Sequence, residues 1–155
     1  MEISFLDQVK IQSRILVPLI KALRNEMGEE RANEFVKGVL GNLYREYGKA
    51  YWNRQEAISP NKKISTLWKM FADGDALDYD VVDDSLKEFN LDIKRCGYAE
   101  FFKKLGEPEL GFLFCCSSDV PMTEGFGGKV KLEVKQTIMQ GAPHCQFRYQ
   151  LGETE

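Results

Sequence analysis

The spacing of hydrophobic residues changes once along this chain, and that change constrains the fold more than any other feature. Up to about residue 74, apolar residues recur every three or four positions, as on one face of a helix. From Leu77 onward they alternate with polar residues, as on one face of a strand. The pattern predicts a helical half, residues 1–74, and a sheet half, residues 75–155, within a single domain of 155 residues.

Three helices are expected in the helical half. The first has its apolar face between Ile15 and Leu23, and Pro18 means that this helix begins near that residue or kinks there. The second carries a wide apolar stripe from Ala32 to Tyr47. A break at Ser59-Pro60-Asn61 precedes a shorter third helix that contains Trp68.

Two hairpins, with short helices between them, are expected in the sheet half. The sum is an α+β fold in which N-terminal helices pack on one face of a four-stranded antiparallel sheet, leaving room for a pocket between the layers. The expected strands are 77–81, 89–95, 130–136 and 145–151, and the expected helices are 96–105 and 107–119.

Charge and hydropathy exclude several classes of partner. The net charge is −3 and no basic stripe is present, so we expect no nucleic-acid partner. No apolar run is long enough to cross a bilayer, and the first seven residues lack the basic region of a secretory signal. We therefore expect a cytoplasmic protein with reduced cysteines, a small-molecule partner and no membrane partner, with a homodimer left open.

All four cysteines and the single histidine follow residue 95, so any thiol or imidazole chemistry belongs to the last third of the chain. Strand phase places Cys145 on the apolar face and puts His144 and Arg148 on the opposite face. His144 follows Pro143, however, so it could still lie in the turn and bend inward. Gln136 has the phase of the apolar residues before it and is either a structural amide or a pocket-lining group beside Cys145.

The other cysteines also allow two interpretations each. Cys96 follows Arg95 at a strand-to-helix junction, where a helix N-terminus and a guanidinium would lower its pKa; otherwise it is a packed residue. Cys115 and Cys116 lie within one helical turn of Asp119 and are either reactive or simply packed in the core.

Metal binding is a further alternative. Cys96, Cys116 and Cys145, with Asp119 or His144, would supply enough ligands for zinc or another divalent metal. The chain contains no C-x-x-C pair, so the spacing is not that of a zinc finger or ribbon.

Taken together, the motifs of the last third resemble the L-2-amino-thiazoline-4-carboxylic acid hydrolase family. The resemblance covers about a third of the chain and departs from the family pattern at Val134, where a basic residue is usual, and at Gln146, where an acid is usual. The matching pieces are Arg95-Cys96, Tyr98-Ala99-Glu100, Leu105 to Gly111, Cys116 with Asp119, Glu124-Gly125-Phe126, Gln136 to Gly141, His144-Cys145 and Phe147-Arg148-Tyr149.

The resemblance implies hydrolytic opening of a thiazoline ring to a carbamoyl-cysteine. That reaction needs a nucleophile or activated water, an acid and a cation for the substrate carboxylate. On this basis Cys145 would be nucleophile or ligand, Asp119 acid or base, and His144 a proton shuttle, with Cys116 beside them. Arg95 or Arg148 would hold the carboxylate, and strand phase favours Arg95. Cys96 and Gln136 would also contact substrate.

Two non-enzymatic readings stay open. The architecture and the late cysteines also look like the 4-vinyl-reductase-type domains that bind small molecules or metals as sensors. Alternatively, the aromatic helical half could serve a structural partner protein, in which case changing Cys145 or Asp119 would alter stability only.

Overall fold

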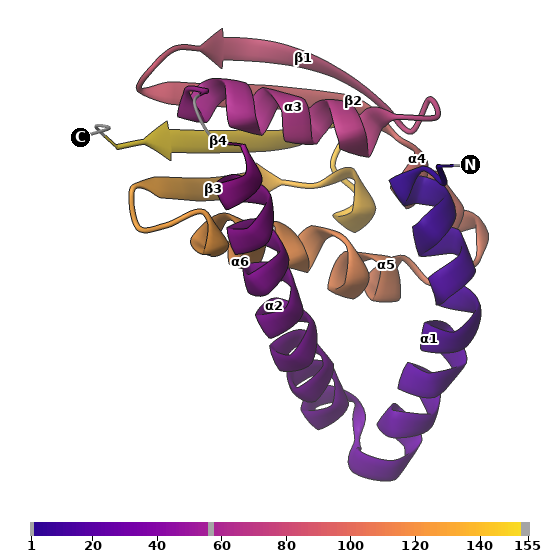
Figure 1. Ribbon diagram of the computed structural model, residues 1–155. Helices are drawn as coiled ribbons and strands as arrows, with labels where there is room; N and C mark the ends of the chain where they lie inside the picture. The colour runs from indigo at the N-terminus through magenta and orange to yellow at the C-terminus, as the bar shows by residue number, and fades with distance from the viewer. Residues whose placement is uncertain (1, 56–57, 153–155) are drawn as a thin grey trace.

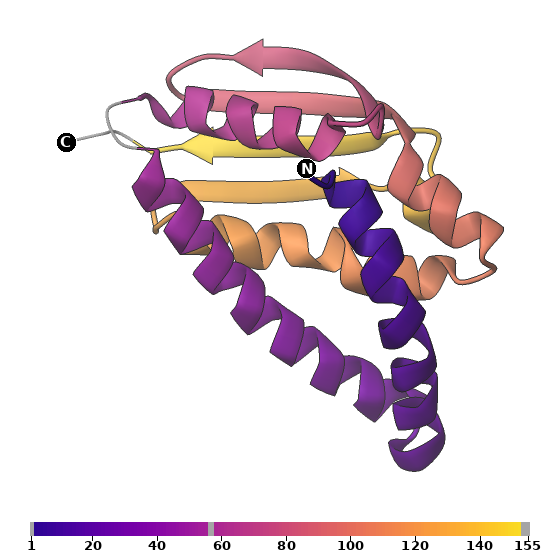
Figure 2. The same cartoon turned by 45° about the vertical axis from the view of Figure 1, so that its right-hand side comes forward.

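The structure is a computed structural model of the chain, and it describes residues 2–55 and 58–152. Two long helices come first, α1 (Phe5–Met27) and α2 (Glu29–Arg54), followed by α3 (Pro60–Ala72). The helices α1 and α2 form a V-shaped hairpin that projects beyond the sheet, whereas α3 lies along the sheet (Figures 1 and 2). Gly28 makes the turn of the V in a left-handed conformation, with φ 84°, that favours glycine.

Pro18 does not start the first helix. The helix starts thirteen residues earlier, at Phe5, and Ser4 caps it: the Ser4 hydroxyl accepts a hydrogen bond from the amide of Asp7 at 3.1 Å. The helix then continues through Pro18 to Met27, so the sequence alternative in which the helix begins at the proline was wrong.

The sheet has four antiparallel strands in the order β1-β2-β4-β3, and the helices lie on one side of it (Figure 2). This confirms the expected α+β class, with short helices between the two hairpins. The strands are β1 (Leu77–Asp84), β2 (Glu88–Cys96), β3 (Val130–Gln136) and β4 (Cys145–Leu151); the intervening elements are α4 (Gly97–Lys104), α5 (Pro108–Phe114), η1 (Cys116–Ser118), α6 (Asp119–Gly125) and η2 (Ile138–Gln140).

The helix expected over residues 107–119 is instead interrupted. α5 ends at Phe114, a 3₁₀ turn follows, and Asp119 begins α6 rather than ending a helix. The hydroxyls of Ser117 and Ser118 donate to the carbonyls of Leu113 and Cys115, each at 2.6 Å. Serine side chains that bond back to preceding carbonyls compete with regular helix, so this pair accompanies the break.

Two hydrophobic cores meet near the middle of the molecule. The sheet core packs the inner face of the sheet against α2, α3 and α6, and includes Phe89 and Phe147. The helical core packs α1 and the start of α2 against α4 and α5, and includes Phe102. Cys96 and Tyr98 pack against both cores, so residues around them lie at the junction.

The main chains of α2 and α6 are in close contact. A side chain on Gly48 would overlap the carbonyl of Met122, and one on Gly125 would overlap the carbonyl of Arg45. Only glycine permits such an approach. Arg45 adds an ion pair to Glu124 at 2.6 Å.

Candidate active site at the junction of the two cores

Cys96 occupies the position that the sequence predicted. It ends β2 and is the N-cap of α4, where its Sγ accepts the amide N–H of Ala99 at 3.4 Å. Burial nevertheless raises the pKa of the Cys96 thiol, and the hydrogen bonds from the helix N-terminus only reduce that increase. The predicted lowering of its pKa is therefore not observed.

Cys145 begins β4 and points to the inner face, as strand phase predicted. It is 5% exposed, and its Sγ accepts the amide N–H of Ile138 at 3.2 Å. Burial raises the pKa of this thiol to about 11, because the thiolate would lose its hydration. At neutral pH it is a neutral thiol.

Asp119 begins α6, directly after the turn that holds Cys115 and Cys116. Burial raises the pKa of the Asp119 carboxyl to about 8. The side chains of Asp119, Cys115 and Cys116 are half-buried, so each keeps some accessible surface. Burial also raises the pKa values of the Cys115 and Cys116 thiols well above that of an ordinary cysteine, and the charge of Asp119 raises both pKa values further.

Seven further side chains surround Asp119 closely enough for its charge to shift their pKa values. We call them, with Asp119, the Asp119 cluster: Tyr44, Cys96, Tyr98, Cys115, Cys116, Cys145 and Tyr149. The fold thus brings all four cysteines of the chain around one carboxyl.

The cluster is electrically neutral at pH 7 and nearly free of cations. Among the described residues, the only cation that shifts a pKa within the cluster is Lys103, acting on Cys145. Two of its phenols are already hydrogen-bonded, Tyr98 to the carbonyl of Phe71 at 2.9 Å and Tyr149 to the indole of Trp68 at 3.1 Å. The cluster can therefore supply a proton from Asp119 in surroundings that contain little water.

His144, Gln136 and Arg148 gather on the other face of the sheet. The amide of Gln136 donates to the His144 carbonyl at 2.9 Å, and His144 Nε2 lies 3.1 Å from the amide nitrogen of Gln146. Arg148 pairs with Asp92 at 2.8 Å. His144 therefore does not bend inward toward Cys145, which agrees with the strand-phase prediction.

The position of Gln136 differs from the expected one because β3 carries a bulge. The pairing shifts between Val134 and Gln136, so Gln136 lies opposite Gln146 rather than in the apolar phase. Residues directly opposite in antiparallel strands share a face, so Gln136 is not beside Cys145.

Arg95 is next to Cys96 in sequence but turns away from the cluster. Its guanidinium bonds Asp78 at 3.0 Å and Glu100 at 3.4 Å, and also contacts Asp75. It is thus held by three carboxylates, and a substrate carboxylate would have to displace one of them.

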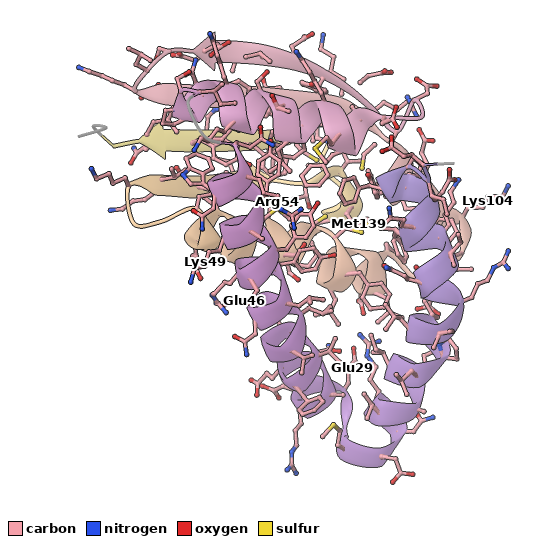
Figure 3. The ribbon with its side chains drawn as sticks, viewed as in Figure 1. Glu29, Glu46, Lys49, Arg54, Lys104 and Met139 are labelled. Atoms are coloured by element: carbon pink, nitrogen blue, oxygen red, sulfur yellow. The ribbon has the colours of Figure 1, made fainter. Side chains whose placement is uncertain are left out.

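Among residues 2–55 and 58–152, no three His, Cys, Asp or Glu side chains are arranged to hold one metal ion. Two surface cavities formed by described residues are lined by no member of the Asp119 cluster. The larger, about 540 Å³, lies between the arms of the V and includes Arg24, Asn33 and Met139. Figure 3 labels Met139 in the interior between the helices and the sheet.

Sequence reasoning missed the three tyrosines of the cluster. Tyr44 and Tyr149 have the spacing of core residues in a helix and a strand, and nothing local distinguishes them from neighbours such as Tyr47. Tyr98 and Tyr149 both lay within pieces that carried the family resemblance, Tyr98-Ala99-Glu100 and Phe147-Arg148-Tyr149, and this was the available signal for them.

Residues 8–149 match the sequence profile of one family, described as L-2-amino-thiazoline-4-carboxylic acid hydrolase. The chain belongs to that family. The match extends well beyond the third of the chain that carried the resemblance, and it includes α1 from its fourth residue, α2 and the Asp119 cluster. No curated protein sequence matches this member of the thiazoline-carboxylate hydrolase family.

The fold also has solved counterparts. One is the crystal structure of the phenol-responsive sensory domain of the transcription activator PoxR with phenol, with a TM-score of 0.55 and 11% sequence identity. The similarity covers 88% of this chain and 72% of that chain. At this identity it concerns the fold of this hydrolase-family member alone. In the described part of the chain, none of the helices has the length and apolar character of a membrane span.

Proposed function

We propose that this protein hydrolyses a 2-amino-thiazoline-4-carboxylate-like ring to a carbamoyl-cysteine, with Asp119 as the acid–base group. The proposal is carried by the carboxyl of Asp119, whose pKa burial raises to about 8 and whose charge acts on all seven other members of the cluster. A group with a pKa near the working pH can both give and take a proton, which is what general acid–base catalysis requires. The family to which the chain belongs is named for this reaction.

The chemistry requires one acid and one water molecule. Asp119 first donates its proton to the ring nitrogen, which makes the carbon between sulfur and nitrogen more electrophilic. The oxygen of water then adds to that carbon while the Asp119 carboxylate accepts a proton from the water. The carbon–sulfur bond then breaks as the carbonyl forms, and the remaining proton of the added hydroxyl passes to the departing sulfur. The ring nitrogen keeps the proton that it received, as the N–H of the carbamoyl group, and Asp119 keeps the proton that it took from water.

In this proposal Cys145 is a packed side chain near Asp119 and is not the nucleophile. Its thiol is neutral at pH 7 and is fixed by the amide of Ile138, whereas covalent catalysis needs a thiolate. Cys116 and Cys96 have the same role, since burial raises the pKa of each. His144 and Arg148 lie beyond the sheet and take no part in the proton transfers.

The test is consumption of L-2-amino-thiazoline-4-carboxylate by the purified chain and by Asp119→Asn. We expect turnover by the parent that declines above about pH 8, and a loss of at least about 100-fold in Asp119→Asn. Asp73→Asn, at an exposed carboxyl, is the matched control and should keep parental activity. Cys145→Ala should keep measurable turnover; complete loss in a folded Cys145→Ala protein would instead favour the thiol as nucleophile.

A second candidate is binding of a small neutral aromatic molecule without turnover. It is favoured by the chemistry of the cluster, where neutral thiols and tyrosine rings surround Asp119 and the nearby cations are few. The fold similarity to a sensory domain crystallised with phenol suggests phenol as the first probe. Absence of ring opening, together with a rise in melting temperature with phenol that Asp119→Asn abolishes, would favour this candidate.

A further inference from the structure

Seven large apolar side chains on the α1–α2 hairpin are exposed although they recur at helical spacing. On α1 they are Ile11, Ile15 and Leu19, and on α2 they are Phe35, Val39, Leu43 and Tyr47. Within each helix the residues lie four positions apart, so each set forms one continuous stripe. Their exposed fractions run from 37% to 72%.

The two stripes open on the same side of the hairpin. At 100° per residue, the centre of the stripe lies about 140° before Ile20 on the packed face of α1 and about 100° before Tyr51 on the packed face of α2. Because α1 and α2 run antiparallel, offsets of the same sense and similar size bring both stripes to one side. The ring of Tyr47 also lies against Phe5 of α1, 6.3 Å between centroids, which is consistent with a shared face.

This apolar face is poor in charge. On α1, the residues that flank Ile15 and the C-terminal side of Leu19 are uncharged, namely Gln12, Pro18 and Ala22, and one charged residue, Arg14, lies beside Ile11 at the edge. On α2, the charged residues also lie at the edges: Glu46 at the outer edge of the stripe and Arg54 near Tyr47 at its end (Figure 3). Depletion of charge at the centre of a patch is the compositional mark of a protein–protein interface.

The size of the face fits a dimer. Aromatic side chains have about 150–250 Å² each and aliphatic ones less, so the seven exposed fractions leave on the order of 600 Å² of apolar-residue surface per chain. That is at the upper end of the patches found on monomers, about 300–600 Å², and approaches the about 800 Å² per partner of a standard interface. The two helices are about 35 and 39 Å long, which is sufficient for a second hairpin to lie across them.

We propose that this face is the interface of a homodimer, in which the α1–α2 hairpins of two chains pack as a four-helix layer about a two-fold axis. A face that is apolar, uncharged at its centre and made of two antiparallel helices is self-complementary, as a two-fold interface requires. Ridges formed by residues four apart pack into the equivalent grooves of the partner. The proposal does not depend on the Asp119 cluster or its chemistry.

The experiment is the molar mass of the full chain in solution, measured by sedimentation at concentrations from 1 to 100 μM, with three variants. Ile15→Glu and Leu43→Glu each place a charge in one stripe, and Leu86→Glu places the same charge at an apolar residue in the β1–β2 turn. Ile15 and Leu86 are matched in exposure, 72% and 73%, so neither change removes a buried contact of the single chain. Far-ultraviolet circular dichroism verifies that each variant is folded.

We expect the parent and Leu86→Glu to sediment at twice the chain mass of 17.8 kDa. Ile15→Glu and Leu43→Glu should sediment as folded monomers, with a dissociation constant raised by at least about 100-fold, because a charge at an interface centre loses its hydration. A parent that is monomeric at 100 μM would overturn the proposal, whether or not lipid or another protein binds the face. A dimer that persists in both hairpin variants would overturn it too.

Discussion

Asp119 is the residue on which the proposed chemistry depends, and its proton has a thermodynamic consequence that is independent of any substrate. The folded chain holds the proton up to about pH 8, whereas an unfolded chain releases it near the ordinary value of 3.8. Folding stability therefore includes a favourable contribution that is complete below pH 4 and is lost as the pH rises toward 8.

The first prediction concerns Asp119→Asn. Between pH 4 and pH 8 the parent's free energy of unfolding should fall by up to about 1.4 kcal/mol per pH unit more steeply than that of Asp119→Asn, because one proton distinguishes the folded and unfolded states. Urea denaturation across this range measures both slopes, and Asp73→Asn again serves as control. Parallel slopes in all three proteins would show that Asp119 titrates near its ordinary pKa and would remove the basis for its catalytic role.

Individual residues also show how far sequence reasoning reaches. Period-two alternation was enough to predict that Cys145 faces inward and Arg148 outward, because β4 is regular there. The same reasoning failed for Gln136, since a bulge in β3 changes the phase without leaving a distinct sequence signal. Tyr44 lies near Asp119 because of the way α2 packs against α6, and no local sequence pattern specifies that packing.

At the scale of elements, the contact between α2 and α6 deserves a direct test, because two glycines allow it. Gly48→Ala should destabilise the protein by about 3 kcal/mol, since the added methyl overlaps the Met122 carbonyl and the helices must separate. Gly38→Ala, on the exposed side of the same helix with nothing within 4 Å of the added carbon, should stabilise by up to about 1 kcal/mol.

Chemical denaturation of both glycine variants measures these differences. The comparison separates helix propensity, which favours alanine at both positions, from the close approach, which opposes it at Gly48 alone. Equal stabilisation by both substitutions would mean that α2 and α6 lie farther apart than the structure places them.

Elements also mark a limit of prediction from sequence. The long amphipathic helices were predictable, because many residues repeat the same period. The short segments between Glu107 and Gly125 were not, because a break, accompanied by the side-chain hydrogen bonds of Ser117 and Ser118, divides a region whose composition is that of a helix. Asp119 was selected as a candidate from its spacing to the cysteines, although its place at the start of α6 was not predicted.

For the molecule as a whole, the question is whether the two hydrophobic cores unfold together. Cys96 and Tyr98 pack against both, and the sheet core contains both tryptophans of the chain at its centre or edge. We therefore expect one cooperative transition, in which damage to either core lowers the stability of both.

The corresponding prediction uses Phe102→Ala in the helical core and Phe89→Ala in the sheet core, both at residues with 0% exposure. Each should cost about 3–5 kcal/mol. Tryptophan fluorescence and far-ultraviolet circular dichroism should give coincident transitions in both variants. Loss of helix signal before the fluorescence change in Phe102→Ala would show that the helical core unfolds separately.

The overall layering was predictable from the change in period, since helices followed by hairpins leave few arrangements that bury both apolar faces. The V of α1 and α2 was not predictable. Its stripes have the same composition as packed ones, and only the structure shows that Ile15 and Leu43 are left uncovered.

The glycine contact between α2 and α6 has a consequence for how this scaffold can be altered. The separation of the two helices is set by main-chain atoms, so it is insensitive to the side chains placed on the rest of either helix. Members of the Asp119 cluster, such as Tyr44 and Cys116, can then be exchanged for others of similar volume without moving the carboxyl near which they lie. Under the proposed function, the scaffold is therefore suited to redesign of substrate preference, because Asp119 keeps its position while the side chains around it change.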